Sequence, residues 1–139
     1  MARSAACKNG GILATVERPL GRRLKAAAAT ARSPFLLFMR PGIVLDAGWI
    51  GEARRFVERS SPDRAAVFRR ASAGQATLRD VWTLLAAALG ALPGADQGVL
   101  IARQFYDSLG GHPEDAVDPE RDFIRRIGRR RLATLAASA

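Results

Sequence analysis

The chain has 139 residues, of which 48% are hydrophobic and 25% are charged, and its net charge is +9. This length suits one domain and is too short for two of ordinary size, and the apolar fraction excludes a fully disordered chain. A single cysteine, Cys7, and a single histidine, His112, exclude an internal disulfide and most metal sites. No apolar run approaches about 18 residues, the rough minimum for a membrane span.

The positive charge lies at the two ends of the chain. Residues 1–40 carry eight basic residues and one acid, and residues 125–139 carry five arginines and no acid. Residues 81–124, in contrast, carry seven acids and two arginines. Twenty of the 22 basic residues are arginine, a bias typical of GC-rich genomes, so the excess of base over acid is the better indication of a polyanionic partner.

The N-terminal segment has the composition of an organellar transit peptide. Residues 1–32 are rich in Arg, Ala, Ser and Thr, nearly free of acid, and compatible with a helix over residues 20–32. We therefore predict a basic tail or transit peptide (1–32), a single domain (33–139) and a mitochondrial location. A disordered basic tail, as in a bacterial cytoplasmic protein, and an upstream stretch added by a wrong start codon remain open.

Most of the remaining chain has helical patterns. Residues 35–39 are a short apolar run that fits either a buried helical turn or a strand. Apolar residues at helical spacing predict a helix over residues 43–59, and Ser61-Pro62-Asp63 predicts the start of another that runs to about residue 72.

Three further helices are expected toward the C-terminus. Thr77 with Asp80 resembles a capping box before an apolar face that ends near residue 90. Asp96 is placed to cap a helix through residue 109, and Asp118-Pro119 to start a last helix that continues past residue 132. We therefore predict an all-α protein, a compact orthogonal bundle of five or six short helices with a basic N-terminal tail.

The sharpest candidate site is the arginine cluster of the predicted last helix: Arg125, Arg126, Arg129, Arg130 and Arg131. Guanidinium groups match the geometry of phosphate and stay charged. Repulsion within such a face destabilises a helix unless a counter-charge relieves it. Nucleic-acid phosphates, a protein partner and the chain's own acidic segment (107–122) are the three sources of counter-charge that the sequence leaves open.

The sequence offers no site for catalysis, a metal or a cofactor. His112 lies in a Gly-Gly-His-Pro segment and is interpreted as a solvated loop residue, and Cys7 as an unused thiol. The acids between residues 114 and 122 lack the spacing of a calcium loop, and no phosphate-binding loop of the Walker type is present. We therefore predict a protein that is not an enzyme.

Residues 32–71 resemble an HMG box. The segment opens with Arg32, Ser33-Pro34 and the run Phe35-Leu36-Leu37-Phe38-Met39-Arg40. It later carries Phe56 or Val57, Ser60-Ser61-Pro62-Asp63-Arg64, Phe68 and Ala71. The resemblance implies that Leu36 is a wedge inserted between base steps in the minor groove, and that Arg32 and Arg40 contact phosphates.

We predict a basic component of a nucleoprotein assembly, such as an organellar ribosome or nucleoid, that binds RNA or DNA through its basic ends. The alternative is a structural or assembly subunit, for instance of a respiratory complex, that docks on proteins through Trp49, Trp82 and Tyr106. A helical interaction protein of bacterial or phage origin is a third possibility.

Overall fold

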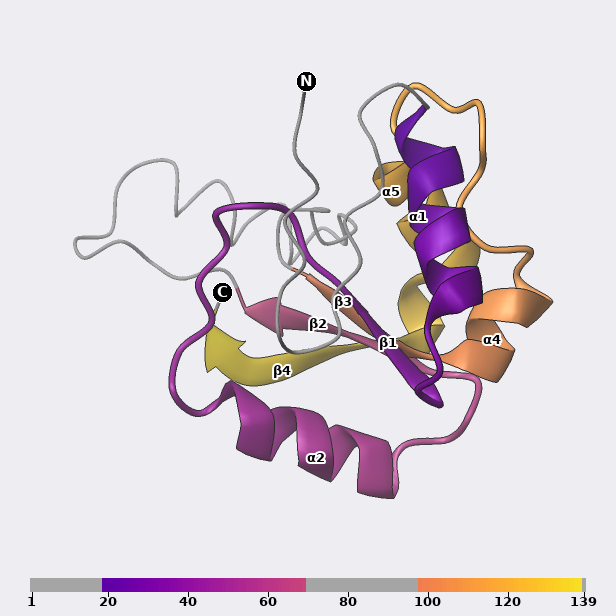
Figure 1. Cartoon of the computed structure of the whole chain (residues 1–139). Coiled ribbons are helices and arrows are strands. Elements are labelled where there is room, and N and C mark those ends of the chain that lie inside the picture. Colours follow the sequence, from indigo (N-terminus) through magenta and orange to yellow (C-terminus); the bar gives the residue numbers. More distant parts are fainter. Residues whose placement is uncertain (1–18, 70–97, 139) are drawn as a thin grey trace.

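The computed structural model describes residues 19–69 and 98–138, which form a mixed four-stranded β-sheet with helices on both faces (Figure 1). In chain order the elements are α1 (Leu20–Thr30), β1 (Phe35–Phe38), α2 (Trp49–Arg59), β2 (Ala65–Arg69), β3 (Val99–Ala102), α4 (Arg103–Ser108), α5 (Pro119–Ile127), the 3₁₀ turn η2 (Arg129–Arg131) and β4 (Leu132–Ser138). The all-α prediction is therefore wrong: the centre of this α+β fold is a sheet.

The strands lie side by side in the order β1-β3-β2-β4. Strand β3 runs antiparallel to both neighbours, with Phe35 opposite Ala102 and Ala65 opposite Ile101, whereas β2 and β4 run parallel with Ala65 beside Leu132. This register brings the starts of β1, β2 and β4 and the end of β3 together, on the right of the sheet in Figure 1. We call this the α4 end of the sheet, because α4 follows β3 there.

Two strands arise from short apolar runs that periodicity does not distinguish from helix. Residues 35–39, left open between helix and strand, contain the edge strand β1. The predicted helix from Asp96 is wrong at its start, because Val99–Ala102 is strand β3 and the chain becomes helical only at Arg103. All four residues of β3 are buried, since it lies between two strands and beneath helices, so alternation is lost.

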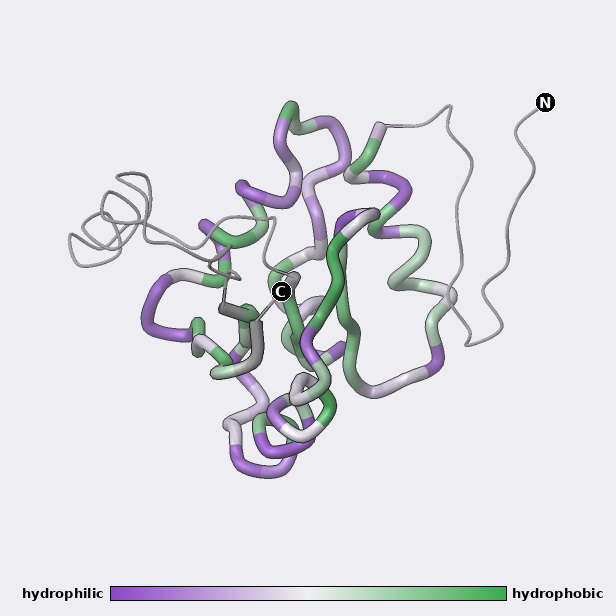
Figure 2. Tube along the Cα trace, turned by 90° about the vertical axis from the view of Figure 1, so that its left-hand side faces the viewer, coloured by the Kyte–Doolittle hydropathy of each residue, from purple (hydrophilic) through white to green (hydrophobic). Residues whose placement is uncertain are grey.

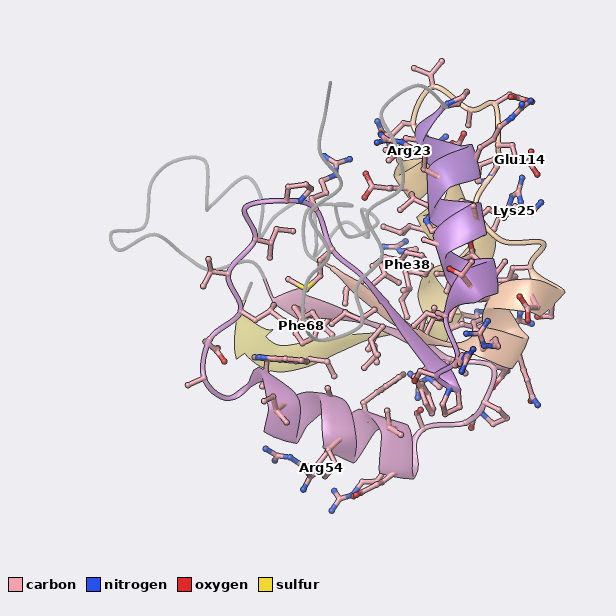
Figure 3. The ribbon with its side chains drawn as sticks, in the orientation of Figure 1. Arg23, Lys25, Phe38, Arg54, Phe68 and Glu114 are labelled. Atoms are coloured by element: carbon pink, nitrogen blue, oxygen red, sulfur yellow. The ribbon has the colours of Figure 1, made fainter. Side chains whose placement is uncertain are left out.

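Helices α1, α4 and α5 cover one face of the sheet, and α2 covers the other (Figure 1). The Phe38 ring lies 5.2 Å from the Tyr106 ring in the first core, and the Phe68 ring lies 6.3 Å from Trp49 in the second (Figure 3). Figure 2 shows the resulting contrast between hydrophobic strands and more hydrophilic outer segments. The molecule thus has two apolar cores, one on each side of the sheet.

Two helices predicted in the first half differ from the structure. The predicted helix over residues 43–59 is confirmed only from Trp49 onward, and the Gly48 N–H before it donates to Asp46 Oδ1 at 2.9 Å. The helix predicted from Ser61 to about residue 72 is wrong: a turn is followed by strand β2 at Ala65. Strand pairing wins because residues 65–68 are almost completely buried between β3 and β4.

The last helix begins as predicted and ends early. Asp118 is its N-cap, accepting the Arg121 N–H at 3.1 Å, and Pro119 is its first residue. The predicted continuation past residue 132 is wrong, because the helix ends at Ile127 and Gly128 has a φ of 77°. That conformation favours glycine and redirects the chain into η2 and then β4.

The predicted N-terminal helix is confirmed as α1, which packs against the first core through Ala28. At Gly21 the helix approaches the loop before α5 so closely that a Cβ there would overlap the carbonyl oxygen of Pro113. The helix predicted over residues 77–90 lies outside the described residues. Among the helices that the structure describes, none is long and apolar enough to cross a bilayer.

Candidate functional site

Arginines from four separate segments lie next to strand ends at the α4 end of the sheet. Arg32 precedes β1, Arg103 follows β3, Arg64 precedes β2 and Arg131 precedes β4. Because Ala65 pairs in parallel with Leu132, Arg64 and Arg131 enter neighbouring strands from the same side. The sheet order therefore gathers positive charge that is scattered along the chain.

A cleft of about 530 Å³ opens at this end, between the last turn of α2 and the start of α4. Its apolar lining comes from Pro34, Phe35, Val57, Pro62 and Ala102. Its polar lining comes from Arg32, Ser33, Ser60, Arg103 and Gln104. Among the described residues no carboxylate lines it, so the cleft favours an anionic or neutral occupant over a cation.

The two arginines of the cleft have different environments. The Arg103 guanidinium closes the C-terminus of α1: its Nε donates to the Ser33 carbonyl at 3.1 Å, one Nη to Ala28 at 2.8 Å and the other to Ala31. The Arg103 side chain therefore uses its donors in hydrogen bonds that attach the end of α1 to the start of α4. Arg32 is exposed, and its side chain has no hydrogen bond or ion pair to any residue that the structure describes.

The predicted arginine cluster is divided by the helix break at Gly128. Arg125 is in α5 and pairs with Asp122 at 3.6 Å, and the Arg126 guanidinium donates to the carbonyls of Leu109 at 3.4 Å and Gly111 at 3.3 Å. Arg125 and Arg129 thus do not share one helical face. Two of the five arginines of the predicted cluster therefore have partners within the chain.

The three arginines of η2 are the part of the cluster without an ion pair in the described residues. All three residues of Arg129–Arg131 are exposed, and no carboxylate of the described residues pairs with them. Arg131 lies over the Phe105 ring, 5.6 Å from its centre, which fixes its position beside α4. Arg129 and Arg130 keep all their donors for solvent or a partner.

The acidic segment (107–122) does not neutralise η2. Glu114 binds Lys25 at 2.9 Å and Arg22 at 3.5 Å, and Asp115 binds Arg22 at 3.1 Å, so two carboxylates hold α1 (Figure 3). The hydrogen bond from Lys25, with the charges of Lys25 and Arg22, lowers the pKa of Glu114. These ion pairs leave Arg129 and Arg130 without an internal counter-charge in the described segments.

The two residues carried by the HMG-box resemblance besides Arg32 lie elsewhere. Leu36 is only 6% exposed in β1, so in this fold its side chain belongs to the core and not to a wedge surface. Arg40 binds Glu120, with nitrogen–oxygen distances of 2.6 and 2.7 Å. Neither residue lies among those that line the cleft.

His112 is a core residue, and its interpretation as a solvated loop residue is wrong. It is 2% exposed and stacks on Phe123 with ring centres 4.4 Å apart. Its backbone N–H donates to the Tyr106 hydroxyl at 3.1 Å, and that hydroxyl lies 3.0 Å from His112 Nδ1 of the ring, to which it can donate. Burial, with the nearby Arg126 charge, lowers the pKa of His112 to about 4, and burial raises that of Tyr106.

This pair has the character of a structural unit. A neutral imidazole accepting at Nδ1 fits both the hydroxyl donor and the lowered pKa. Gly111, with a φ of 71°, brings the backbone so close to Tyr106 that a Cβ would lie 3.0 Å from its ring. In the described segments, no group of three His, Cys, Asp or Glu side chains is arranged to hold a metal ion.

Four residues were not assigned to a site from the sequence: Val57, Ser60, Gln104 and Arg64. The first three line the cleft, whereas Arg64 precedes β2 beside it. They come from separate segments that the packing of α2 and the pairing of β2 with β3 bring to one end of the sheet. No local motif marks them. No protein family model, curated protein or solved structure matches the chain, so the function is argued from its own residues.

Proposed function

We propose that the protein is a non-enzymatic nucleic-acid-binding component of a nucleoprotein assembly, such as an organellar ribosome or nucleoid. Phosphates would bind to arginines at the α4 end of the sheet. The binding is then mainly electrostatic, sensitive to salt and weakly dependent on sequence.

The observation that carries this proposal is the set of unneutralised arginines at one end of the sheet. Arg32, Arg64, Arg129 and Arg130 are all exposed, and none pairs with a carboxylate of the described residues. The nearby acid Asp63 is also without an ion pair there, so it reduces the local charge without binding an arginine. Exposed arginines that lie at one end of a fold without a counter-charge are typical of a binding site for polyanions.

The alternative, docking on proteins through aromatic side chains, has less support in this fold. Tyr106 is 2% exposed and hydrogen-bonded inside the first core. Trp49 is partly buried against Phe68 in the second core. Trp82, the third residue named for that function, lies outside the described residues. Tyr106 therefore has no surface for a partner, and Trp49 lies outside the residues that line the cleft.

The direct test is binding of the full chain to fluorescent RNA and DNA, with two double variants that remove the same charge. Arg129→Gln/Arg130→Gln removes the unpaired arginines of η2. Arg54→Gln/Arg55→Gln removes two exposed arginines of α2, of which Arg54 is labelled in Figure 3 and Arg55 pairs with Glu52. We expect the first to weaken binding about tenfold at low salt and the second about twofold or less. Equal effects would mean that only net charge matters, and no binding at low salt would end the proposal.

A further inference from the structure

The cleft at the α4 end suggests which form of nucleic acid is bound. Its volume of about 530 Å³ lies within the range of about 300–1,000 Å³ that is usual for small-molecule sites. We propose, resting on the proposed function, that the cleft holds one nucleotide of a single strand whose backbone continues across Arg64 and Arg129–Arg131.

The chemistry of the lining fits a nucleobase with its phosphate. Phe35, Pro34 and Val57 give apolar surface for the faces of a flat ring. The Gln104 amide and the Ser60 hydroxyl both donate and accept hydrogen bonds, as the edges of bases require. Arg32, exposed and without a partner among the described residues, supplies a charge for phosphate.

The cleft and the arginines are neighbours along the chain and across the sheet. Pro62 lines the cleft, and two residues later Arg64 leads into β2. Parallel pairing of β2 with β4 then places Arg131 next to Arg64, and Arg129 and Arg130 precede it in η2. A backbone leaving the cleft past Pro62 therefore meets these arginines in turn.

A single strand suits this surface better than a duplex. In a duplex the bases are stacked and paired, so none enters a protein cleft without being unstacked at a cost. The bases of a single strand are free to turn outward onto apolar side chains. Two described helices reach this end. Helix α4 has only six residues and follows the buried strand β3, and α2 contributes its last turn while its apolar side packs in the second core, so neither projects as a recognition helix.

The test uses the full chain with three probes: a single-stranded oligonucleotide of about ten nucleotides, a duplex of the same length, and a free mononucleotide. Val57→Phe narrows the cleft, and Val44→Phe makes the same change at a residue that is 81% exposed and outside the cleft. We expect Val57→Phe to weaken single-strand binding about tenfold and duplex binding less than twofold. Val44→Phe should change neither.

A second variant keeps the test decisive if Val57→Phe does not fold. Gln104 is exposed, and Gln104→Ala should weaken single-strand binding by about two- to tenfold, the loss of one hydrogen bond. Duplex binding that is as tight as single-strand binding, and unchanged in these variants, would overturn the inference and leave the proposed function standing.

The remaining outcomes separate the occupant from the proposed function. A mononucleotide could bind as tightly as the oligonucleotide, with the binding of both probes lost in Val57→Phe. That result would show that the cleft is a site for free nucleotides and would overturn the inference that it holds part of a single strand. Absence of binding to all three probes at about 50 mM salt would refute the proposed function together with this inference.

Discussion

The buried His112 makes the stability of the fold depend on pH in a way that can be calculated. Its pKa is about 4 in the folded chain and about 6.5 when unfolded, a difference of about 2.5 pH units. Between these values the unfolded chain binds a proton that the folded chain rejects, so unfolding becomes easier as the pH falls. At about 1.4 kcal/mol per unit, the loss reaches about 3 kcal/mol near pH 4 and then stops growing.

The assay is urea unfolding of the wild type and of His112→Gln at several pH values between about 7 and 4. Gln keeps an acceptor for the Tyr106 hydroxyl and does not titrate, whereas it loses the stacking on Phe123 and starts from lower stability. Carboxylates titrate in both proteins, so the difference between the two curves isolates the histidine. The difference should shrink as the pH falls from 6.5 to 4, because only the wild type loses the histidine contribution. Parallel curves would refute the buried neutral histidine.

Three substitutions test the packing of α1 and α5. Gly21→Ala should destabilise the fold by about 1 kcal/mol or more, because the new methyl group overlaps Pro113. The control Gly51→Ala in α2 should be neutral or stabilising by up to about 1 kcal/mol. Equal shifts of the melting temperature in the two variants would contradict the close approach at Gly21. Asp118→Ala should cost about 1 kcal/mol in chemical denaturation through loss of the N-cap, and an unchanged midpoint would argue against it. Arg103→Lys cannot reproduce the three hydrogen bonds to carbonyl groups at the C-terminus of α1, so it should lower the free energy of unfolding by roughly 1–3 kcal/mol. Protease cleavage should then appear first in α1. An unchanged free energy of unfolding would mean that α1 does not need these hydrogen bonds.

Local signals predicted the starts of α1 and α5, and failed where strands β2 and β3 replace the expected helices. Asp118 supplies the N-cap and Pro119 a φ that is already fixed near the helical value, so α5 starts where the sequence indicates. The residues Val99, Ala102, Phe105, Tyr106 and Leu109 have helical spacing although a strand becomes a helix among them. Both elements are buried, and a short buried strand has no alternation that would reveal it.

The site was predictable only in part, and for a similar reason. The excess of arginine at the C-terminus is visible in the sequence, and Arg129 and Arg130 are indeed exposed. The helix break at Gly128 separates them from Arg125. This break depends on a positive φ at Gly128, which the spacing of residues in the sequence does not indicate. The cleft joins Arg32, Ser60 and Gln104 from three distant segments, a juxtaposition that requires the strand order.

The most direct test of a phosphate site at the α4 end is the salt dependence of single-strand binding. Each phosphate contact contributes about 0.7 to the slope of log affinity against log salt. The double variant Arg129→Gln/Arg130→Gln should lower that slope by about 1.4, and the charge-matched Arg54→Gln/Arg55→Gln should leave it nearly unchanged. An unchanged slope in the first variant, or an equal decrease in both, would contradict the assignment of phosphate contacts to this end of the sheet.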